Sequence, residues 1–235
     1  QRHQCILPED VSWAHLNATQ TAGDQGSCGS CSALATAAAL AAHHELHRGS
    51  MRSFAPQELI SCVPNPEACG GQGGCKGGFM ELLMAYVLRH GLHEEKEYPY
   101  TSSLTSEAGD CKTRTMDNTM VGTQPGIYSS LMEGPSTNFG MVGYERLPVN
   151  QYEPLLHALV ERGPVVVALA ASGWHWYGGG IFNGCAKDAV VDHAVVLLGF
   201  GADKRRRKRY WHLLNSWGPN WGEAGKLRLL RRDNE

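Results

Sequence analysis

The most informative stretch of the sequence is Gln25-Gly26-Ser27-Cys28-Gly29-Ser30-Cys31, which leads directly into an alanine-rich run from Ser32 to His47. Ala and Leu are among the strongest helix formers and Gly49 supplies a stop, so the sequence predicts a helix over residues 31–48. Its small side chains allow other segments to pack closely on several sides. A thiol at a helix N-terminus ionises more easily, because the backbone N–H groups there favour an anion. A buried structural cysteine is the alternative interpretation of this stretch alone.

Composition limits the classes of protein that fit. The 235 residues, 42% of them hydrophobic, suit one large domain or two modest ones. A formal net charge of −2 gives no electrostatic case for a nucleic acid or an anionic membrane. No apolar run approaches the roughly 18 residues of a membrane span. The short polar start predicts either a cytosolic protein or one whose leader has been removed.

Eight cysteines are many for a cytosolic enzyme of this length. Cys62, Cys69 and Cys75 crowd among glycines and prolines, which is typical of a disulfide-linked loop region in a secretory protein. Cys28-x-x-Cys31 also has the spacing of zinc ligands, but no second close pair accompanies it, so we expect no metal and no cofactor. Asn17-Ala18-Thr19 is an N-glycosylation sequon, which agrees with a secretory route.

The order of the predicted elements indicates an α+β protein. Helical patterns cover 56–62, 79–90 and 154–162, whereas residues 165–170, 190–200, 210–214 and 226–230 read as strands. Residues 101–140 read as a long loop or insertion. The basic run 204–209 is expected to be a solvated hairpin tip, with a nucleic-acid or trafficking role or a processing site as alternatives. We therefore predict a helical subdomain and a β-rich subdomain with a cleft between them.

Cysteine catalysis requires a base, a group that orients the base and a donor for the developing oxyanion. His193 opens an apolar strand, where a charged side chain is awkward unless it faces a cleft. Asn215 follows the next strand and Trp217 comes two residues later, so an amide and a shielding indole are available. Gln25 lies six residues before Cys31. Taken singly, His193 also fits a satisfied core histidine and Asn215 a turn former.

Together these segments resemble the papain family of cysteine proteases, which includes the lysosomal cathepsins. The resemblance runs in the same order along nearly the whole chain and leaves roughly 112–150 unmatched. It rests on the segments Cys28-Gly29-Ser30-Cys31, Pro56-Gln57-Glu58-Leu59, Gly74-Cys75-Lys76-Gly77-Gly78, Tyr98-Pro99-Tyr100, Gly163-Pro164-Val165, Gly179-Gly180-Ile181-Phe182, Asp192-His193-Ala194-Val195, Asn215-Ser216-Trp217-Gly218 and Trp221-Gly222-Glu223.

The resemblance implies one papain-like peptidase domain over residues 1–235. Its helical half would be about 12–111 and its half with a β-barrel-like sheet about 112–235, with 112–150 a probable insertion. Cys31 would be the nucleophile and His193 the base and acid, in a thiolate–imidazolium pair. Asn215 would orient His193, and Gln25 with the backbone N–H of Cys31 would form the oxyanion hole. Substrate-binding positions would be Gly29, Gly77, Gly78, Phe79, Met80, Ala168, Asp192, Ala194 and Trp217, and the two alanines imply a preference for a bulky apolar residue two before the scissile bond.

The resemblance also implies disulfides, partners and a compartment. Cys28–Cys75 and Cys62–Cys111 match two staples of the helical half, and Cys5–Cys69 is assigned by elimination. Polypeptide substrates, the chain's own propeptide and cystatin-like inhibitors are the expected partners. A lysosome-like, vacuolar or secreted location follows.

Two departures from the family leave the function open. Ser32 stands where the family has an aromatic residue, and His193 follows Cys31 by 162 residues, more than the usual 130–150 or so. The extra length could cap the cleft and favour an exopeptidase. A catalytically silent papain-like subunit with a binding or assembly role is the alternative to an active peptidase.

Overall fold

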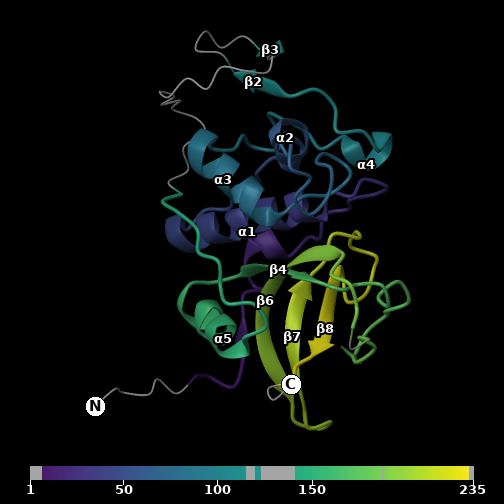
Figure 1. The fold of residues 1–235 in the computed structure, drawn as a ribbon. Helices are drawn as coiled ribbons and strands as arrows, with labels where there is room; N and C mark the ends of the chain where they lie inside the picture. The colour runs from purple at the N-terminus through teal and green to yellow at the C-terminus, as the bar shows by residue number, and fades with distance from the viewer. Residues whose placement is uncertain (1–6, 115–119, 123–140, 187, 233–235) are drawn as a thin grey trace.

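A computed structural model describes residues 7–114, 120–122, 141–186 and 188–232. The first half holds the short 3-10 helix η1 (Asn17–Thr19) and the helices α1 (Cys31–Arg48), α2 (Pro56–Cys62), α3 (Met80–His90) and α4 (Ser102–Thr105). The predicted helices over 31–48, 56–62 and 79–90 are confirmed. In Figure 1, α2 and α3 lie on one side of α1 and the sheet of the second half lies on the other.

Helix α1 is buried on opposite sides because its side chains are small. Ala37 and Leu40 pack in a core cluster with Leu83 and Val87 of α3. On the other side, Ala35 belongs to a second cluster, which also holds residues of the sheet. The helix ends at Gly49, whose φ of 70° is left-handed and whose N–H donates to the Glu45 carbonyl at 2.8 Å.

The second half is built around an antiparallel sheet. After α5 (Tyr152–Glu161) it contains β4 (Val165–Leu169), β5 (Ile181–Phe182), β6 (His193–Asp203), β7 (Lys208–Leu214) and β8 (Lys226–Leu230). The strand β1 (Val11–Ser12), from the first part of the chain, joins the same sheet. The order is β1-β6-β7-β8-β5, with β4 also on β6, and only the β5–β8 pair is parallel. The predicted α+β fold, with a helical half and a half built on a sheet, is confirmed. The sheet is not a closed barrel, because β1 and β4 pair with β6 alone and β5 with β8 alone among the described strands.

Two strands of this sheet carry almost no sequence signal. β1 and β5 have two residues each, which is too short for a period-2 pattern. β1 nonetheless pairs with β6 in antiparallel fashion. Val11 lies opposite Phe200, and Ser12 lies opposite Gly199. Gly199 has a φ of 156°, and a Cβ there would collide with the Val11 carbonyl. Glycine is therefore required where β1 approaches the bulge in β6.

Two predicted disulfides, Cys28–Cys75 and Cys62–Cys111, are present in the helical half. For the third prediction, Cys5 lies outside the described residues, and Cys69 carries no disulfide to a described residue. Most of the predicted insertion at 112–150 also lies outside them, apart from its ends and the small pair β2 (Lys112–Arg114) and β3 (Met120–Gly122). Within the described ranges, no helix is long and apolar enough to cross a membrane.

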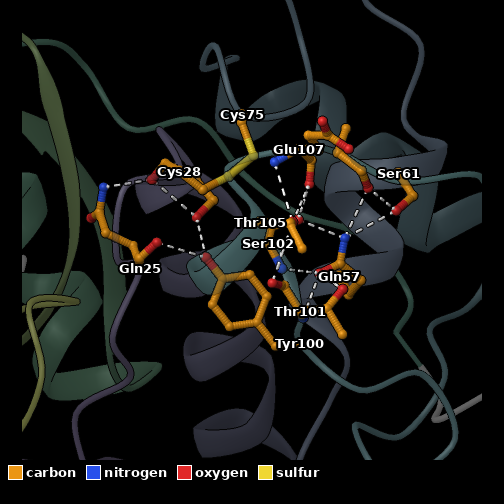
Figure 2. Close-up of a disulfide and its surroundings, with 12 residues drawn as sticks. Gln25, Cys28, Gln57, Ser61, Cys75, Tyr100, Thr101, Ser102, Thr105 and Glu107 are labelled. Carbon is orange, nitrogen blue, oxygen red and sulfur yellow. Dashed lines mark hydrogen bonds between the residues drawn. A yellow bond between two sulfur atoms is a disulfide. The ribbon is translucent and has the colours of Figure 1, made fainter.

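A buried glutamine holds the loop before the second disulfide in place. The Gln57 Oε1 accepts hydrogen bonds from the backbone N–H groups of Thr101 and Ser102, and its Nε2 donates to the Ser102 hydroxyl and the Ala108 carbonyl. Figure 2 shows this network on one side of the Cys28–Cys75 disulfide and Gln25 on the other. The Pro56-Gln57 segment is one of those that resemble the family. Its role here is structural, because the hydrogen bonds of Gln57 hold residues 101–108 in place.

Candidate active site

Cys31 is the first residue of α1 and half-buried. The preceding loop is fixed on both flanks: Cys28 is held by its disulfide to Cys75, and the Gly29 N–H donates to the Cys75 carbonyl at 2.9 Å. A Cβ on Gly29 would lie 2.6 Å from that carbonyl oxygen, so the loop requires glycine there. The first backbone N–H groups of a helix have no partner within it, so the thiol sits beside unpaired donors.

His193 and Asn215 meet at the edge of the sheet. His193 is the first residue of β6, and Asn215 follows the last residue of β7. The His193 Nε2 and Asn215 Oδ1 are 2.7 Å apart, and the same oxygen accepts the Ser216 N–H at 2.8 Å. Because the Ser216 N–H can only donate, it fixes which end of the amide is the oxygen. The Nε2 of His193 therefore carries the proton, and Nδ1 is left free to accept one.

Cys31 begins α1 in one half and His193 begins β6 in the other, and Cys31 packs against the cluster that holds Ala194. The backbone N–H of Ala194, the residue after His193, lies beside the Cys31 thiol. Among the described residues, no hydrogen bond joins the thiol to the histidine ring. Burial raises the pKa of Cys31, although the N–H groups of Ala194 and Ser32 oppose it. Burial also lowers the pKa of His193, against the opposing effect of Asn215. Both directions favour the neutral thiol and imidazole in this arrangement, so the thiolate–imidazolium pair stays a prediction.

Aromatic rings enclose the histidine–asparagine contact. The Trp217 ring lies 5.1 Å from that of His193, and the fully buried Trp174 lies edge-on to His193 at 6.1 Å. Trp221 packs on both tryptophans, at 5.1 Å and 6.3 Å between ring centroids. Excluding water strengthens a hydrogen bond, so these rings favour the His193–Asn215 contact.

Gln25 is held on the other side of the cysteine loop. Its Nε2 donates to the Cys28 carbonyl at 3.0 Å, and its Oε1 accepts the Ser216 hydroxyl at 2.8 Å. The Tyr100 hydroxyl also donates to the Gln25 carbonyl. Ser216 thus connects Gln25 to the residue after Asn215, and the amide has a defined orientation near Cys31.

The predicted substrate positions lie on elements of both halves. Gly77, with a φ of 81°, and Gly78 follow Cys75 in the glycine-rich loop beside the disulfide. Ala168 pairs with Ala194 across β4 and β6, and Met80 packs in the same cluster as Ala194. Asp192 has a structural contact, because its Oδ1 accepts the Ala171 N–H at 2.8 Å. Phe79 lies just before the first residue of α3, and it is 52% exposed.

Ser32 is buried behind the nucleophile. Its side chain lines a small cavity together with Gly77, Gly78 and Phe79. The cavity measures about 20 Å³, enough for one water molecule. The hydroxyl of Ser32 and this small cavity beside Gly77 and Gly78 therefore stand where the family has an aromatic side chain.

Three contributors to this site were not predicted from the sequence: Trp174, His175 and Ser216. The His175 ring stacks on Trp217, with 5.1 Å between centroids and 7° between planes. The cluster Trp174-His175-Trp176 was a usable signal, because aromatic residues make up only 8% of the chain. Asn17, the predicted glycosylation site, is exposed, and its Nδ2 donates to Glu45 at 2.8 Å.

Comparisons with known proteins identify the family of the chain. The chain is 33% identical to cysteine protease XCP2 of Arabidopsis thaliana over 96% of its own length and 55% of that protein. It thus spans little more than half of this relative. The structure matches procathepsin L 3 of Tenebrio molitor with a TM-score of 0.76 at 31% identity, covering 98% of this chain and 66% of that one. Bromelain of Ananas comosus, solved with the E64 inhibitor, also matches at 0.76 and 27% identity, with 97% and 92% covered.

The family model described as papain family cysteine protease matches residues 7–235, which include every candidate catalytic residue. Together with the geometry of Cys31, His193 and Asn215, this match shows that the chain belongs to the papain family of cysteine proteases.

Proposed function

We propose that this protein is an active cysteine peptidase that hydrolyses peptide bonds through an acyl-enzyme. The observation that carries the proposal is the fixed tautomer of His193, whose Nε2 proton is held by Asn215 so that Nδ1 is available to take the proton of the Cys31 thiol. The thiolate attacks the peptide carbonyl carbon, and the imidazolium then gives its proton to the departing amine. Water, deprotonated by the same ring, hydrolyses the thioester and restores the thiol.

The oxyanion would be held by the backbone N–H of Cys31 and the Gln25 side-chain amide. The first is supported by the position of Cys31 at the start of α1, and the second by the two hydrogen bonds that fix Gln25. The thiolate–imidazolium pair forms by transfer of one proton within the site, so the two groups titrate as a pair.

The substrate chain would lie in extended form along Gly77 and Gly78, where no side chains obstruct its backbone. Met80 and the small residues Ala168 and Ala194 favour a bulky apolar side chain two residues before the scissile bond. Trp217 would border the leaving group. By family membership we also propose a propeptide and cystatin-like inhibitors as partners, and a lysosome-like, vacuolar or extracellular compartment.

Covalent labelling tests the proposal directly. An epoxysuccinyl reagent is applied to the folded chain between pH 4.5 and 8.5, and the modified cysteine is located by mass spectrometry. We expect rapid labelling of Cys31 in mild acid, no labelling in Cys31→Ala, and a rate lowered roughly 100-fold in Asn215→Ala, since that variant loses the group that orients the base.

Cys185→Ser is the matched control, because Cys185 is a free and exposed thiol outside the site. It should label at the wild-type rate. A wild-type rate that rises only at alkaline pH would contradict the ion pair, and an unlabelled Cys31 throughout would contradict peptidase function and favour a silent binding subunit.

A further inference from the structure

Six consecutive basic residues form the turn between β6 and β7 and the first residues of β7. We call Lys204–Arg209 the basic tip. All six are exposed, and the hairpin closes with Asp203 opposite Lys208. In Figure 1 this hairpin projects from the end of the sheet that lies away from α1. The predicted solvated hairpin tip is confirmed, but its charge is not explained by folding.

The charge of the basic tip is only partly neutralised. Arg206 pairs with Asp203 at 2.8 Å, and Lys204 pairs with Glu9 at 3.3 Å. Residues 204–208 and these two carboxylates together carry a formal charge of +3, whereas the whole chain carries −2, so the other residues carry −5. The basic tip is therefore positive while the remainder of the chain is net acidic, and it would orient the protein toward an anionic partner.

The hairpin presents these charges on a rigid support. β6 and β7 are paired from Val196–Leu214 to Asp203–Lys208, and β7 is paired on its other edge with β8 from Tyr210 onward. Arg207 closes the turn with a φ of 54°. Because the backbone is already ordered, binding costs little backbone entropy.

The chemistry of the tip selects among anionic partners. It contains no aromatic side chain on which bases could stack and no apolar side chain that could enter a bilayer. Its arginines suit bidentate recognition of sulfate and carboxylate groups. The two disulfides belong to an oxidising compartment, away from nucleic acids and from the anionic cytoplasmic leaflet. We propose that the basic tip binds a linear anionic polysaccharide.

Such binding would leave the candidate active site open. β6 has His193 at its first residue and Asp203 at its last. At roughly 3.3 Å per residue, these ends lie about 30 Å apart. A polysaccharide on the basic tip would therefore hold the protein at a surface or matrix while peptides still reach Cys31.

The test measures retention of the full, disulfide-intact chain on immobilised heparin, a sulfated chain, and on polygalacturonate, a carboxylated one. Arg205→Gln/Arg207→Gln/Lys208→Gln removes three charges from the tip and leaves the Arg206–Asp203 pair. Arg48→Gln/Arg89→Gln/Arg162→Gln removes three exposed charges elsewhere and is the matched control. Cleavage of a short peptide, or labelling of Cys31, should be the same in all three proteins.

We expect the tip variant to bind heparin at least about tenfold more weakly than the control variant. The slope of log affinity against log salt should fall by about 2, as for the loss of three contacts to a polyanion. Retention by heparin alone would assign sulfate as the partner group, and retention by both would assign polyanions generally. Equal weakening in both variants, or tighter binding to DNA or phosphatidylserine vesicles than to either polysaccharide, would overturn the proposal.

Discussion

The two halves of this protein are held together by different means. The helical half carries both described disulfides, which close segments of 47 and 49 residues around a glycine-rich loop. In the sheet half, no disulfide joins described residues, and stability comes from paired strands and a core that includes Trp174, Leu197, Leu213 and Leu227. Cross-links thus occur where regular backbone pairing is sparse. Removing a disulfide from the helical half and truncating a core side chain in the sheet half test that contrast.

The largest effect is expected from the Cys62–Cys111 disulfide. In Cys62→Ser/Cys111→Ser, the unfolded chain regains the freedom of a 49-residue segment, which corresponds to about 4 kcal/mol. Guanidinium unfolding followed by circular dichroism measures the loss. The two halves should separate into two transitions, with the helical half unfolding first. A single transition at the wild-type midpoint would show that this disulfide does not stabilise the helical half.

Leu213→Ala tests the sheet half in the same assay. Leu213 is 1% exposed and packs in the core of the sheet, so its truncation should cost about 3 kcal/mol through lost burial and a residual cavity. Combined with Cys62→Ser/Cys111→Ser, which separates the two transitions, Leu213→Ala should move the transition of the sheet half and not that of the helical half. Leu104→Ala is the control, because Leu104 is 90% exposed and lies outside this core. Equal losses in both variants would contradict the packing account.

A smaller effect is expected at the ion pair that joins the segment before β5 to β8. Glu223 contacts Arg228 at 2.6 Å and accepts the Gly180 N–H at 2.9 Å. Arg228 is the main cause of the lowered pKa of Glu223, so the pair stabilises the fold above the ordinary glutamate pKa of about 4.3. That contribution is lost as the pH falls through the lower folded value.

Glu223→Gln should therefore cost about 1 kcal/mol at pH 6 and less at pH 3, because the contribution of the ion pair declines as the pH falls toward the lowered pKa of the wild-type carboxyl. Thermal unfolding at both pH values measures the difference. Glu67→Gln is a control at an exposed position. A Glu223→Gln penalty that is the same at both pH values would exclude the ion pair as its cause.

Much of the fold could be predicted because it depends on local patterns. The run of alanines fixed the prediction of α1, and Pro56 with Gly91 marked the start and end of further helices. β1 and β5 escaped prediction because two-residue strands exist only through their partners. That the sheet stays open could not be predicted from the sequence either, because the pairing of its edge strands depends on segments that are distant in the chain.

The candidate site likewise has residues that the sequence could indicate and contacts that it could not. Cys31, His193 and Asn215 became candidates because their residue types suit cysteine catalysis and because, taken together, their segments resemble the papain family. The enclosure of His193 by Trp174 and the link between Gln25 and Ser216 join residues from distant parts of the chain, so only the folded arrangement shows them. The contact of the Cys31 thiol with the Ala194 N–H is of the same kind.

The placement of Cys31 on α1 and of His193 on β6 has a consequence for local unfolding. β6 pairs with β1, β4 and β7, so hydrogen exchange should be slowest along this strand. Cys31, by contrast, belongs to the half that depends on disulfides. A partial opening that leaves each half folded would still separate thiol from imidazole. Under the proposed function, reactivity of the cysteine would then disappear before either half melts, so labelling of Cys31 would report on the docking of the two halves.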